Sequence, residues 1–285
     1  MPPLAPPTIP DTTDPEHYPL GRSDHEARRL TLQHRIYGPG TRQLLQTAGV
    51  TSGMRVLDVG SGAGDVALLL ADLVGPTGEV VGIEFAAESI AIATDRARAA
   101  GVERTVRFVQ ADLRDLTLDD HFDAIVGRWV LMYQPDPVAL LRRLARLLRP
   151  GGLIAFQESD LVDVPRPYPP APVHEQVFTW LTPPEGAPVP EQRMGPKLFG
   201  AFVEAGLPAP SLRVDTPAGG GPQWPGYELV AATVRSLLPM MEALGAVSAD
   251  EVDIETLADR LRDEVVAAHG VQVLAPVYGA WCRMP

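Results

Sequence analysis

The sequence predicts an α/β protein in which a parallel sheet carries helices on both faces. Short apolar runs alternate with helix-like segments between residues 50 and 160, which is the pattern of repeated strand–helix–strand units. A glycine cluster follows the first apolar run, and several later runs end in a charged residue. Because ligands of such sheets bind at the carboxyl ends of the strands, we expect these charged residues to meet in one crevice.

The stretch 54–65, MRVLDVGSGAGD, predicts the first strand, a tight glycine turn and the start of a helix. Glycine has no Cβ and adopts positive φ freely, so the turn lets the backbone approach a ligand closely. A dinucleotide-binding turn would carry a third Gly or Ala where Asp65 stands, and Asp58 adds an acid before the turn. Two carboxylates would repel a pyrophosphate, so a cationic or zwitterionic ligand suits the turn better.

The next elements continue the alternation. Residues 66–74 predict a helix, and 79–84 predict a second strand. This strand ends in Glu84, about 20 residues beyond the turn, where such folds place an acid that accepts hydrogen bonds from ribose hydroxyls. An ordinary charge at a strand end is the alternative role. Residues 87–100 predict a helix that ends at Gly101.

The third strand, 106–112, also ends in an acid. Asp112 there either contacts a ligand or caps the turn that follows. Residues 122–126 predict the fourth strand, which leads into Arg128. We expect Arg128 either to contact the ligand or to form a structural ion pair.

An amphipathic helix and a fifth strand complete this region. Asp136 caps the helix, and residues 153–156 predict a strand that leads into Glu158. The predicted apolar stripe of the helix comprises Val138, Leu141, Leu144 and Leu148, and its solvated face comprises Arg142, Arg143, Arg146 and Arg149.

The amino-terminal region predicts a tail and two helices. Residues 1–20 hold seven prolines and little apolar periodicity, which predicts a flexible tail. A capping box at Ser23 begins a helix that we expect to end at Tyr37, because a Gly-Pro pair follows. Residues 41–48 predict a second short helix.

The carboxyl-terminal half is rich in proline. Residues 161–225 hold 15 of the 30 prolines, which predicts a stiff, irregular insertion. The elements expected from here on are helices at 172–181 and 197–205, a sixth strand at 211–214, helices at 227–244 and 249–269, and a last strand at 271–283.

Composition excludes several classes of protein. The net charge of −12 disfavours nucleic acid and anionic membrane surfaces as partners. The single cysteine, Cys282, excludes an internal disulfide framework and a cysteine-rich metal site. No apolar run approaches the length of a membrane span, and the amino terminus lacks a secretory pattern. We therefore expect a cytoplasmic protein without a membrane partner.

Residues 50–160 resemble the core of the class I methyltransferases that depend on S-adenosyl-L-methionine (SAM). VLDVGSGAG resembles motif I, VVGIE the ribose strand, QADLRDL the adenine strand, FDAIVGRWVLMY the strand after it, and LLRPGGLIAFQE the following helix and strand. The small-molecule branch, which includes menaquinone and natural-product methyltransferases, is the most similar. The sequence departs from many relatives in carrying Ser61 where they have Cys.

The resemblance implies a Rossmann-like seven-stranded sheet of order 3-2-1-4-5-7-6, with its last strand antiparallel and with helical cap insertions. It implies five segments: a flexible tail at 1–20, lid helices at 21–50, a SAM-binding core at 51–160, a proline-rich and helical cap with the sixth strand at 161–270, and the last strand at 271–285. Asp112 would bind the adenine amino group and Leu113 would offer a backbone amide. The cofactor residues implied are Gln33, Asp58, Gly60, Ser61, Gly62, Glu84, Phe85, Asp112, Leu113 and Arg128.

Methyl transfer from a sulfonium is an in-line displacement that depends on alignment of the acceptor and exclusion of water. A base is needed only for an acceptor that holds its proton at working pH. His174, Glu158 and Tyr37 are the candidates for this role, with His34 as a competitor, and a structural histidine is the alternative role of His174. No metal is expected, because the fourth strand ends without the carboxylate that catechol-type relatives use for magnesium.

Three functions follow for consideration. The first is methyl transfer to an O, N or C nucleophile of a small, apolar or aromatic metabolite. The second is a non-methylating reaction on the same fold, such as a cyclisation or decarboxylation. The third is an NAD-dependent oxidoreductase, which Asp65 disfavours. We expect a small-molecule substrate, no nucleic acid and a possible homodimer.

Overall fold

The computed structural model describes residues 24–114, 116 and 121–285, so the predicted tail and the Ser23 cap lie outside the described residues. The chain divides into two compact units. The sheet unit comprises residues 34–161, 191–216 and 275–285, and the helical unit comprises the chain up to residue 33 with 162–190 and 217–274.

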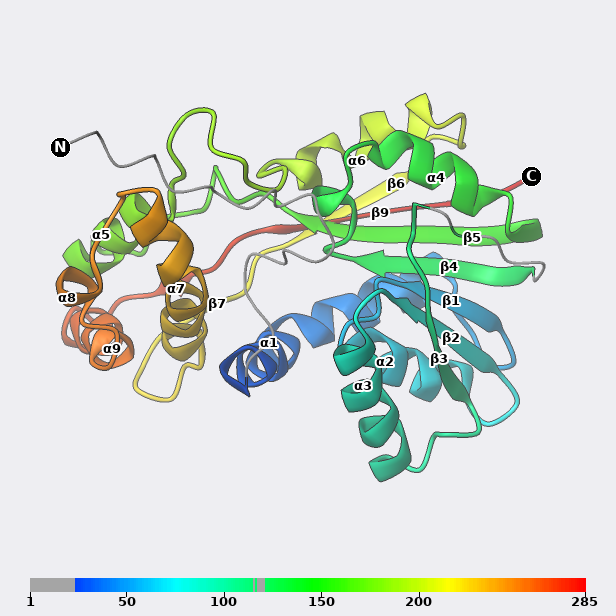
Figure 1. The fold of residues 1–285 in the computed structure, drawn as a ribbon, viewed down its shortest axis with the longest axis horizontal. Coiled ribbons are helices and arrows are strands. Elements are labelled where there is room, and N and C mark those ends of the chain that lie inside the picture. The colour runs from blue at the N-terminus through cyan, green and yellow to red at the C-terminus, as the bar shows by residue number, and fades with distance from the viewer. Residues whose placement is uncertain (1–23, 115, 117–120) are drawn as a thin grey trace, which may run out of the picture. The chain divides into compact units, whose positions relative to one another are not determined.

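A seven-stranded sheet forms the centre of the sheet unit, in the order β3-β2-β1-β4-β5-β9-β6 (Figure 1). The first five strands run parallel, and β9 runs antiparallel to both of its neighbours. This confirms the predicted order, with β9 as the predicted seventh strand. The strands are β1 Arg55–Val59, β2 Glu79–Glu84, β3 Val106–Gln110, β4 Phe122–Arg128, β5 Leu148–Ser159, β6 Ser211–Asp215 and β9 Val277–Arg283.

Helices bury both faces of this sheet. Successive side chains of a strand point to opposite faces, so Val56 and Leu57 of β1 enter two different apolar clusters. Leu57 packs in the cluster that includes α4 and α6, and Val56 packs in the cluster that includes α2 and the end of α1. The helices are α1 Asp24–Ala48, α2 Asp65–Val74, α3 Ala87–Ala99, α4 Pro137–Ala145 and α6 Met194–Glu204, with the 3₁₀ helix η1 at Leu131–Tyr133.

The prediction of two separate amino-terminal helices was wrong, because α1 continues through Pro39. Proline removes one backbone donor, the one that would serve the carbonyl four residues earlier in the helix. Leu44 and Leu45 beyond the proline are each 1% exposed. Burial of these side chains therefore outweighs the local signal for a helix end.

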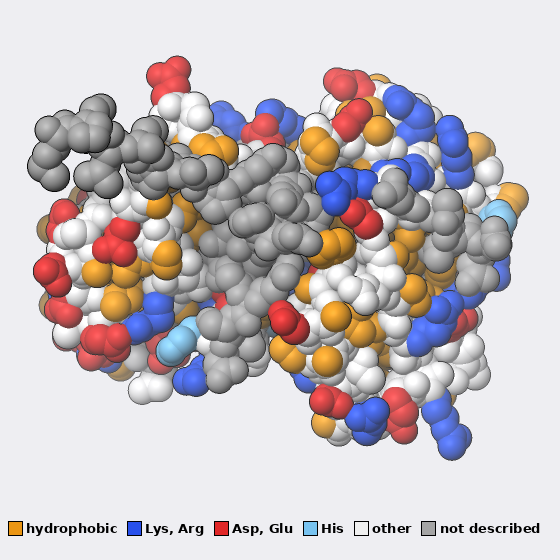
Figure 2. All heavy atoms as spheres, viewed as in Figure 1, with side chains coloured by type: hydrophobic (Ala, Val, Ile, Leu, Met, Phe, Trp, Pro, Cys, Tyr) orange, Lys and Arg blue, Asp and Glu red, His pale blue; other side chains and the backbone are white. Residues whose placement is uncertain are grey.

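The start of α4 agrees with its predicted cap, and its end does not. The carboxylate of Asp136 accepts a hydrogen bond from the backbone of Ala139 at 2.8 Å. The helix ends at Ala145, so Leu148 begins β5 rather than completing the predicted stripe. Lys and Arg side chains gather on the surface over α4 (Figure 2). Arg142 there is exposed and donates to the carbonyl of Glu204 at 2.9 Å.

The helical unit holds α5 Pro172–Leu181, α7 Gly226–Ala243, α8 Ala249–Val252 and α9 Leu257–Ala267, with the short strand pair β7 Ala218–Gly219 and β8 Gln272–Val273. The predicted helix at 249–269 is interrupted because Asp253 adopts a left-handed conformation with φ of 44°. The predicted last strand is split into β8 and β9, with Pro276 between them. Both α6 and β6 belong to the sheet unit.

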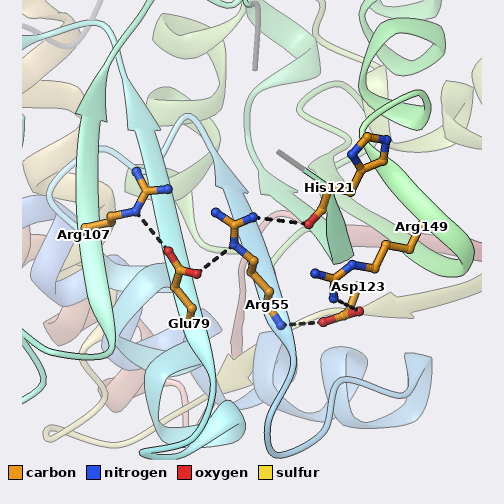
Figure 3. Close-up of polar contacts among 6 residues, drawn as sticks. All are labelled: Arg55, Glu79, Arg107, His121, Asp123 and Arg149. Carbon is orange, nitrogen blue, oxygen red and sulfur yellow. Dashed lines mark hydrogen bonds and ion pairs between the residues drawn. The ribbon is translucent and has the colours of Figure 1, made fainter. Parts of the chain in front are cut away.

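Charged residues join the amino-terminal parts of five strands, β1 to β5 (Figure 3). Glu79 at the start of β2 accepts hydrogen bonds from Arg55 at 2.7 Å and from Arg107 at 3.0 Å. Asp123 accepts one from the backbone of Arg55 at 2.8 Å and one from Arg149 at 2.6 Å. Each such contact is worth little at an exposed site, but together they favour a single register of the strands.

A polar hollow of about 310 Å³ lies beside this cluster, lined partly by Asp123, Arg149 and Arg283. It lies at the amino-terminal edge of the sheet, opposite the charged strand ends that the sequence singled out.

Of the helices in the described part of the chain, none combines the length and the apolar character that a membrane crossing needs.

Gly127→Ala should destabilise the sheet unit. A Cβ at this position would lie 2.3 Å from the Phe156 ring, which is fully buried, so the substitution forces the core apart. We expect a loss of about 1–3 kcal/mol, measured as a lower melting temperature by calorimetry. Gly200→Ala is the control: its helical position has no atom closer than 4.0 Å, so the variant should gain about 0.5–1 kcal/mol. Shifts of equal sign in the two variants would contradict this packing.

Candidate functional site

Charged side chains from four strands lie at the carboxyl edge of the sheet. Asp58 is the last residue but one of β1, Glu84 ends β2 and Arg128 ends β4. Glu158 is the last residue but one of β5. The strands are parallel and in register, with Asp58 opposite both Gly82 and Val126, so these residues share one edge.

The glycine turn after β1 has the geometry that requires glycine. Gly60, Gly62 and Gly64 have φ of 64°, 52° and 87°, all in the left-handed region. A Cβ at Gly60 would lie 2.7 Å from Val130, whereas one at Gly62 would meet no atom within 4 Å. The backbone at Gly62 therefore faces open space, where a ligand can approach it.

Glu84 is fixed beside this turn by backbone donors. Its Oε2 accepts a hydrogen bond from the Gly62 N–H at 3.0 Å, and its Oε1 accepts one from the Ala86 N–H at 2.9 Å. Each carboxylate oxygen can accept a second hydrogen bond. The half-buried carboxylate is thus oriented in advance and can still accept two hydroxyl donors.

Asp58 is buried and lacks a partner at one oxygen. The residue is 1% exposed, and its Oδ2 has no hydrogen bond. Burial raises the pKa of Asp58 to about 8, although the nearby Arg128 guanidinium favours the charged form. The hydroxyl of Ser61, also buried, likewise has no partner. Two unpartnered polar groups therefore flank the turn.

Arg128 lies among these acids without a direct ion pair. Its Nη1 donates to the Thr41 hydroxyl at 3.1 Å, and its guanidinium lies 4.7 Å from the centre of the Trp129 ring. Within the described residues, no carboxylate oxygen lies within 4.0 Å of its nitrogens. Burial lowers the pKa of Arg128, and the charges of Asp65 and Asp58 oppose this effect.

Asp65 is paired, which weakens the electrostatic argument drawn from the sequence. Its carboxylate lies 2.6 Å from Arg96 of α3, and Arg96 also donates to the carbonyl of Ala63 at 2.6 Å. With Asp65 paired and the pKa of Asp58 raised, the turn carries less negative charge than two free carboxylates would give. The sequence offered no signal that singled out Arg96 among the charged residues of its helix.

Asp112 performs the turn-capping role in this structure. Its Oδ1 accepts the backbone N–H of Arg114 at 2.8 Å, and both oxygens accept hydrogen bonds from the Arg114 guanidinium. The side-chain bond to Arg114 holds the pKa of Asp112 below its ordinary value. Leu113 beside it packs against the apolar cluster of α4, and the carbonyl of Phe85 accepts from Gln110 at 3.0 Å.

Glu158, a candidate base, is fully buried and engaged by backbone donors. It accepts hydrogen bonds from the N–H groups of Val130, Leu131 and Met132 at 2.9, 2.7 and 3.4 Å. These groups begin η1 and have no partner within that helix. The carboxylate therefore holds the segment after β4 in place, and burial raises its pKa to about 7.

His174 and Gln33 belong to the helical unit. The Nδ1 of His174 lies 2.6 Å from Glu264, and its Nε2 lies 2.8 Å from the amide nitrogen of Gln272. The ring is 3% exposed and both nitrogens are engaged, which is the arrangement of a structural histidine rather than of a base. The Oε1 of Gln33 accepts a hydrogen bond from Arg29 at 3.1 Å.

Tyr37, the third candidate base, is also engaged. Its hydroxyl donates to the carbonyl of Ala275 at 3.1 Å, and burial raises its pKa well above the ordinary value. Its ring meets Trp129 edge to face, with 5.3 Å between ring centres. One turn earlier on α1, the buried Nδ1 of His34 has no partner, and burial lowers the pKa of this histidine. Sequence reasoning did not single out Trp129, although it directly follows Arg128.

No group of three or more His, Cys, Asp or Glu side chains is placed to hold an ion, as far as the described residues extend.

Comparison with known proteins agrees with this geometry. Residues 50–182 match the model of a family described as a methyltransferase domain. A 2-phytyl-1,4-naphtoquinone methyltransferase of Synechococcus elongatus is 36% identical over 138 residues, which are 48% of this chain and 56% of that relative. The match thus spans little more than half the length of that relative.

Two solved structures share the fold. A SAM-dependent methyltransferase from Geobacter sulfurreducens in complex with S-adenosyl-L-homocysteine is 22% identical, with a TM-score of 0.50 and coverage of 89% of this chain and 97% of that one. The [4+2]-cyclase SpnF is 20% identical, with a TM-score of 0.51 and coverage of 97% and 98%. At these identities the likeness concerns the fold alone.

The buried Glu158 should make stability depend on pH. Its folded-state pKa of about 7 lies above the ordinary value of 4.5, so the folded protein keeps a proton that the unfolded chain releases. The free energy of unfolding should therefore fall as the pH rises from about 4.5 to about 7. Glu158→Gln removes the titration, so its melting temperature should fall less than that of the wild type between about pH 5 and pH 8. Equal falls in calorimetric scans of the two proteins would contradict the raised pKa.

Proposed function

We propose that the chain, whose residues 50–182 match a methyltransferase domain and which resembles the class I, SAM-dependent family, transfers the methyl group of SAM to a small-molecule acceptor. The observation that carries the proposal is the pairing of an open glycine backbone at Gly62 with the oriented carboxylate of Glu84. Hydroxyl donors of a ribose fit these two features.

The groups around the turn fit SAM. The unpartnered Asp58 Oδ2 accepts hydrogen bonds from a ligand that carries an ammonium group, as the methionine part of SAM does. Arg128, which lacks an ion pair among the described residues, suits the carboxylate of that part. We propose that Phe85, Asp112 and Leu113 hold the adenine, while Gly60 and Ser61 complete the turn. For Asp112 this requires that its contact with Arg114 leave an acceptor site free.

Bound SAM supplies an electrophilic methyl group. Of the three predicted bases, each is engaged in a structural contact, so the described residues act mainly by aligning the acceptor and excluding water. His34 is the remaining candidate for moving a proton, because its Nδ1 is buried and unpartnered and burial keeps the ring neutral. Such a site suits an acceptor that is already a good nucleophile.

For the acceptor we propose a planar aromatic metabolite. The support is the 36% identity to an enzyme named for a naphthoquinone, together with the partly exposed Trp129 at the carboxyl edge. A homodimer, a cytoplasmic location and the lack of a nucleic-acid partner stay predictions.

Incubation with SAM and reduced naphthoquinones should release S-adenosylhomocysteine. We expect a methylated product that gains a deuterated methyl group when SAM carries one, detected by mass spectrometry. Binding of S-adenosylhomocysteine without any transfer across a panel of aromatic acceptors would favour a non-methylating reaction instead. Absence of S-adenosylhomocysteine binding by calorimetric titration would overturn the proposed function altogether.

Glu84→Ala should weaken cofactor binding. Loss of a charge-assisted hydrogen bond costs roughly 1–3 kcal/mol, so the Kd for S-adenosylhomocysteine should rise about 5- to 150-fold in calorimetric titration. Glu79→Gln is the matched control, because Glu79 begins the same strand at the opposite edge and is held by Arg55 and Arg107. The control should bind with wild-type affinity, and an equal loss in both variants would remove Glu84 from the site.

A further inference from the structure

Trp129 adopts a backbone conformation that costs energy. Its φ is 55°, in the left-handed region, where a side chain with a Cβ is disfavoured. Such a conformation persists only when the surrounding contacts impose it, and these cases cluster at functional sites. The contacts around Trp129 therefore decide whether the strain has a use.

The end of β5 imposes this conformation from two sides. The backbone N–H of Trp129 donates to the carbonyl of Gln157 at 2.8 Å, and the indole Nε1 donates to the hydroxyl of Ser159 at 2.8 Å. Glu158, between these two residues, takes the three N–H groups that follow Trp129 in the chain. Three consecutive residues of β5 thus fix the residue, its ring and the segment after it.

The residue that follows Trp129 in the chain contacts the glycine turn. Val130, the residue after Trp129, approaches Gly60 so closely that a Cβ there would lie 2.7 Å away. The Arg128 guanidinium lies 4.7 Å from the ring centre, and Tyr37 meets the ring edge to face. The ring itself stays partly exposed. It is a rigid aromatic surface beside the proposed cofactor turn.

We propose that Trp129 is the residue on which the acceptor stacks, and that Glu158 and Ser159 are positioning residues that keep its ring turned toward the crevice. The inference rests on the proposed function and names its acceptor class, a planar aromatic ring. Stacking on the indole sets the height of the acceptor ring above the turn, and hence its alignment with the methyl group. The energy stored in the left-handed backbone is the cost of presenting the ring there.

The test measures binding of menadione, a planar naphthoquinone, to the protein saturated with S-adenosylhomocysteine. Trp129→Ala should raise the Kd for menadione about 2- to 12-fold, the range of an aromatic pair, and leave the Kd for S-adenosylhomocysteine unchanged. Trp129→Phe keeps a ring but loses the hydrogen bond to Ser159, so it should raise the menadione Kd less than Trp129→Ala does. Trp281→Ala is the matched control, because Trp281 packs against the cluster on the sheet face that holds α2. It should leave both constants unchanged.

Ser159→Ala tests the positioning role without removing the ring. It should raise the KM for a naphthoquinol acceptor, lower kcat and leave the S-adenosylhomocysteine Kd unchanged, because a loosened indole binds the acceptor less tightly and aligns it less well with the methyl group. Three results would overturn the inference: no menadione binding by the saturated wild type, an unchanged menadione Kd in Trp129→Ala, or a rise confined to the S-adenosylhomocysteine Kd. The last result would assign Trp129 to the cofactor. Failure of the wild type to bind S-adenosylhomocysteine is a separate outcome that contradicts the proposed function.

Discussion

The hydrogen bond from the Gly62 N–H to the Glu84 carboxylate is the contact on which the rest of the site depends. It joins the turn after β1 to the end of β2 at 3.0 Å, and a second bond from Ala86 fixes the other carboxylate oxygen. A residue with a Cβ could reach the φ of 52° at Gly62 only with strain. The hydrogen bond between Gly62 and Glu84 therefore fixes both the open backbone and the orientation of the acid. Both groups are in place before a ligand binds.

The fold was predictable because its signals are local and repeated. Alternating apolar runs and glycine stops predicted the parallel strands with their helices, and the resemblance to class I methyltransferases implied the strand order, which the structure confirms. Where the prediction was wrong, burial overrode a local signal: α1 passes through Pro39 because Leu44 and Leu45 are held against the sheet. At Asp253 the sequence carries no local signal at all, because no pattern indicates that this residue adopts a left-handed conformation and ends α8.

The polar residues at the strand ends were predictable in position but not in partner. A sequence shows that Glu158 follows a buried strand, but not that three N–H groups of a distant segment will surround it. The same holds for His174, whose partners Glu264 and Gln272 lie about 90 and 98 residues away in the chain. Choosing candidate bases by their ordinary pKa values therefore selected groups that have structural roles. Burial and hydrogen bonding decide which groups stay free, and the sequence does not show either.

The engagement of these groups has a consequence for the chemistry. Glu158 and Tyr37 are engaged in hydrogen bonds that hold neighbouring segments of the site in place. The site is therefore built for fixed geometry rather than for proton transfer. For an in-line displacement at a sulfonium this is sufficient, because alignment of donor and acceptor supplies much of the barrier reduction. The strained backbone of Trp129 follows the same logic, since three residues of β5 combine to fix one ring. Under the proposed function, selectivity for the acceptor depends on the shape of a rigid surface, and the acceptor has to be a good nucleophile already.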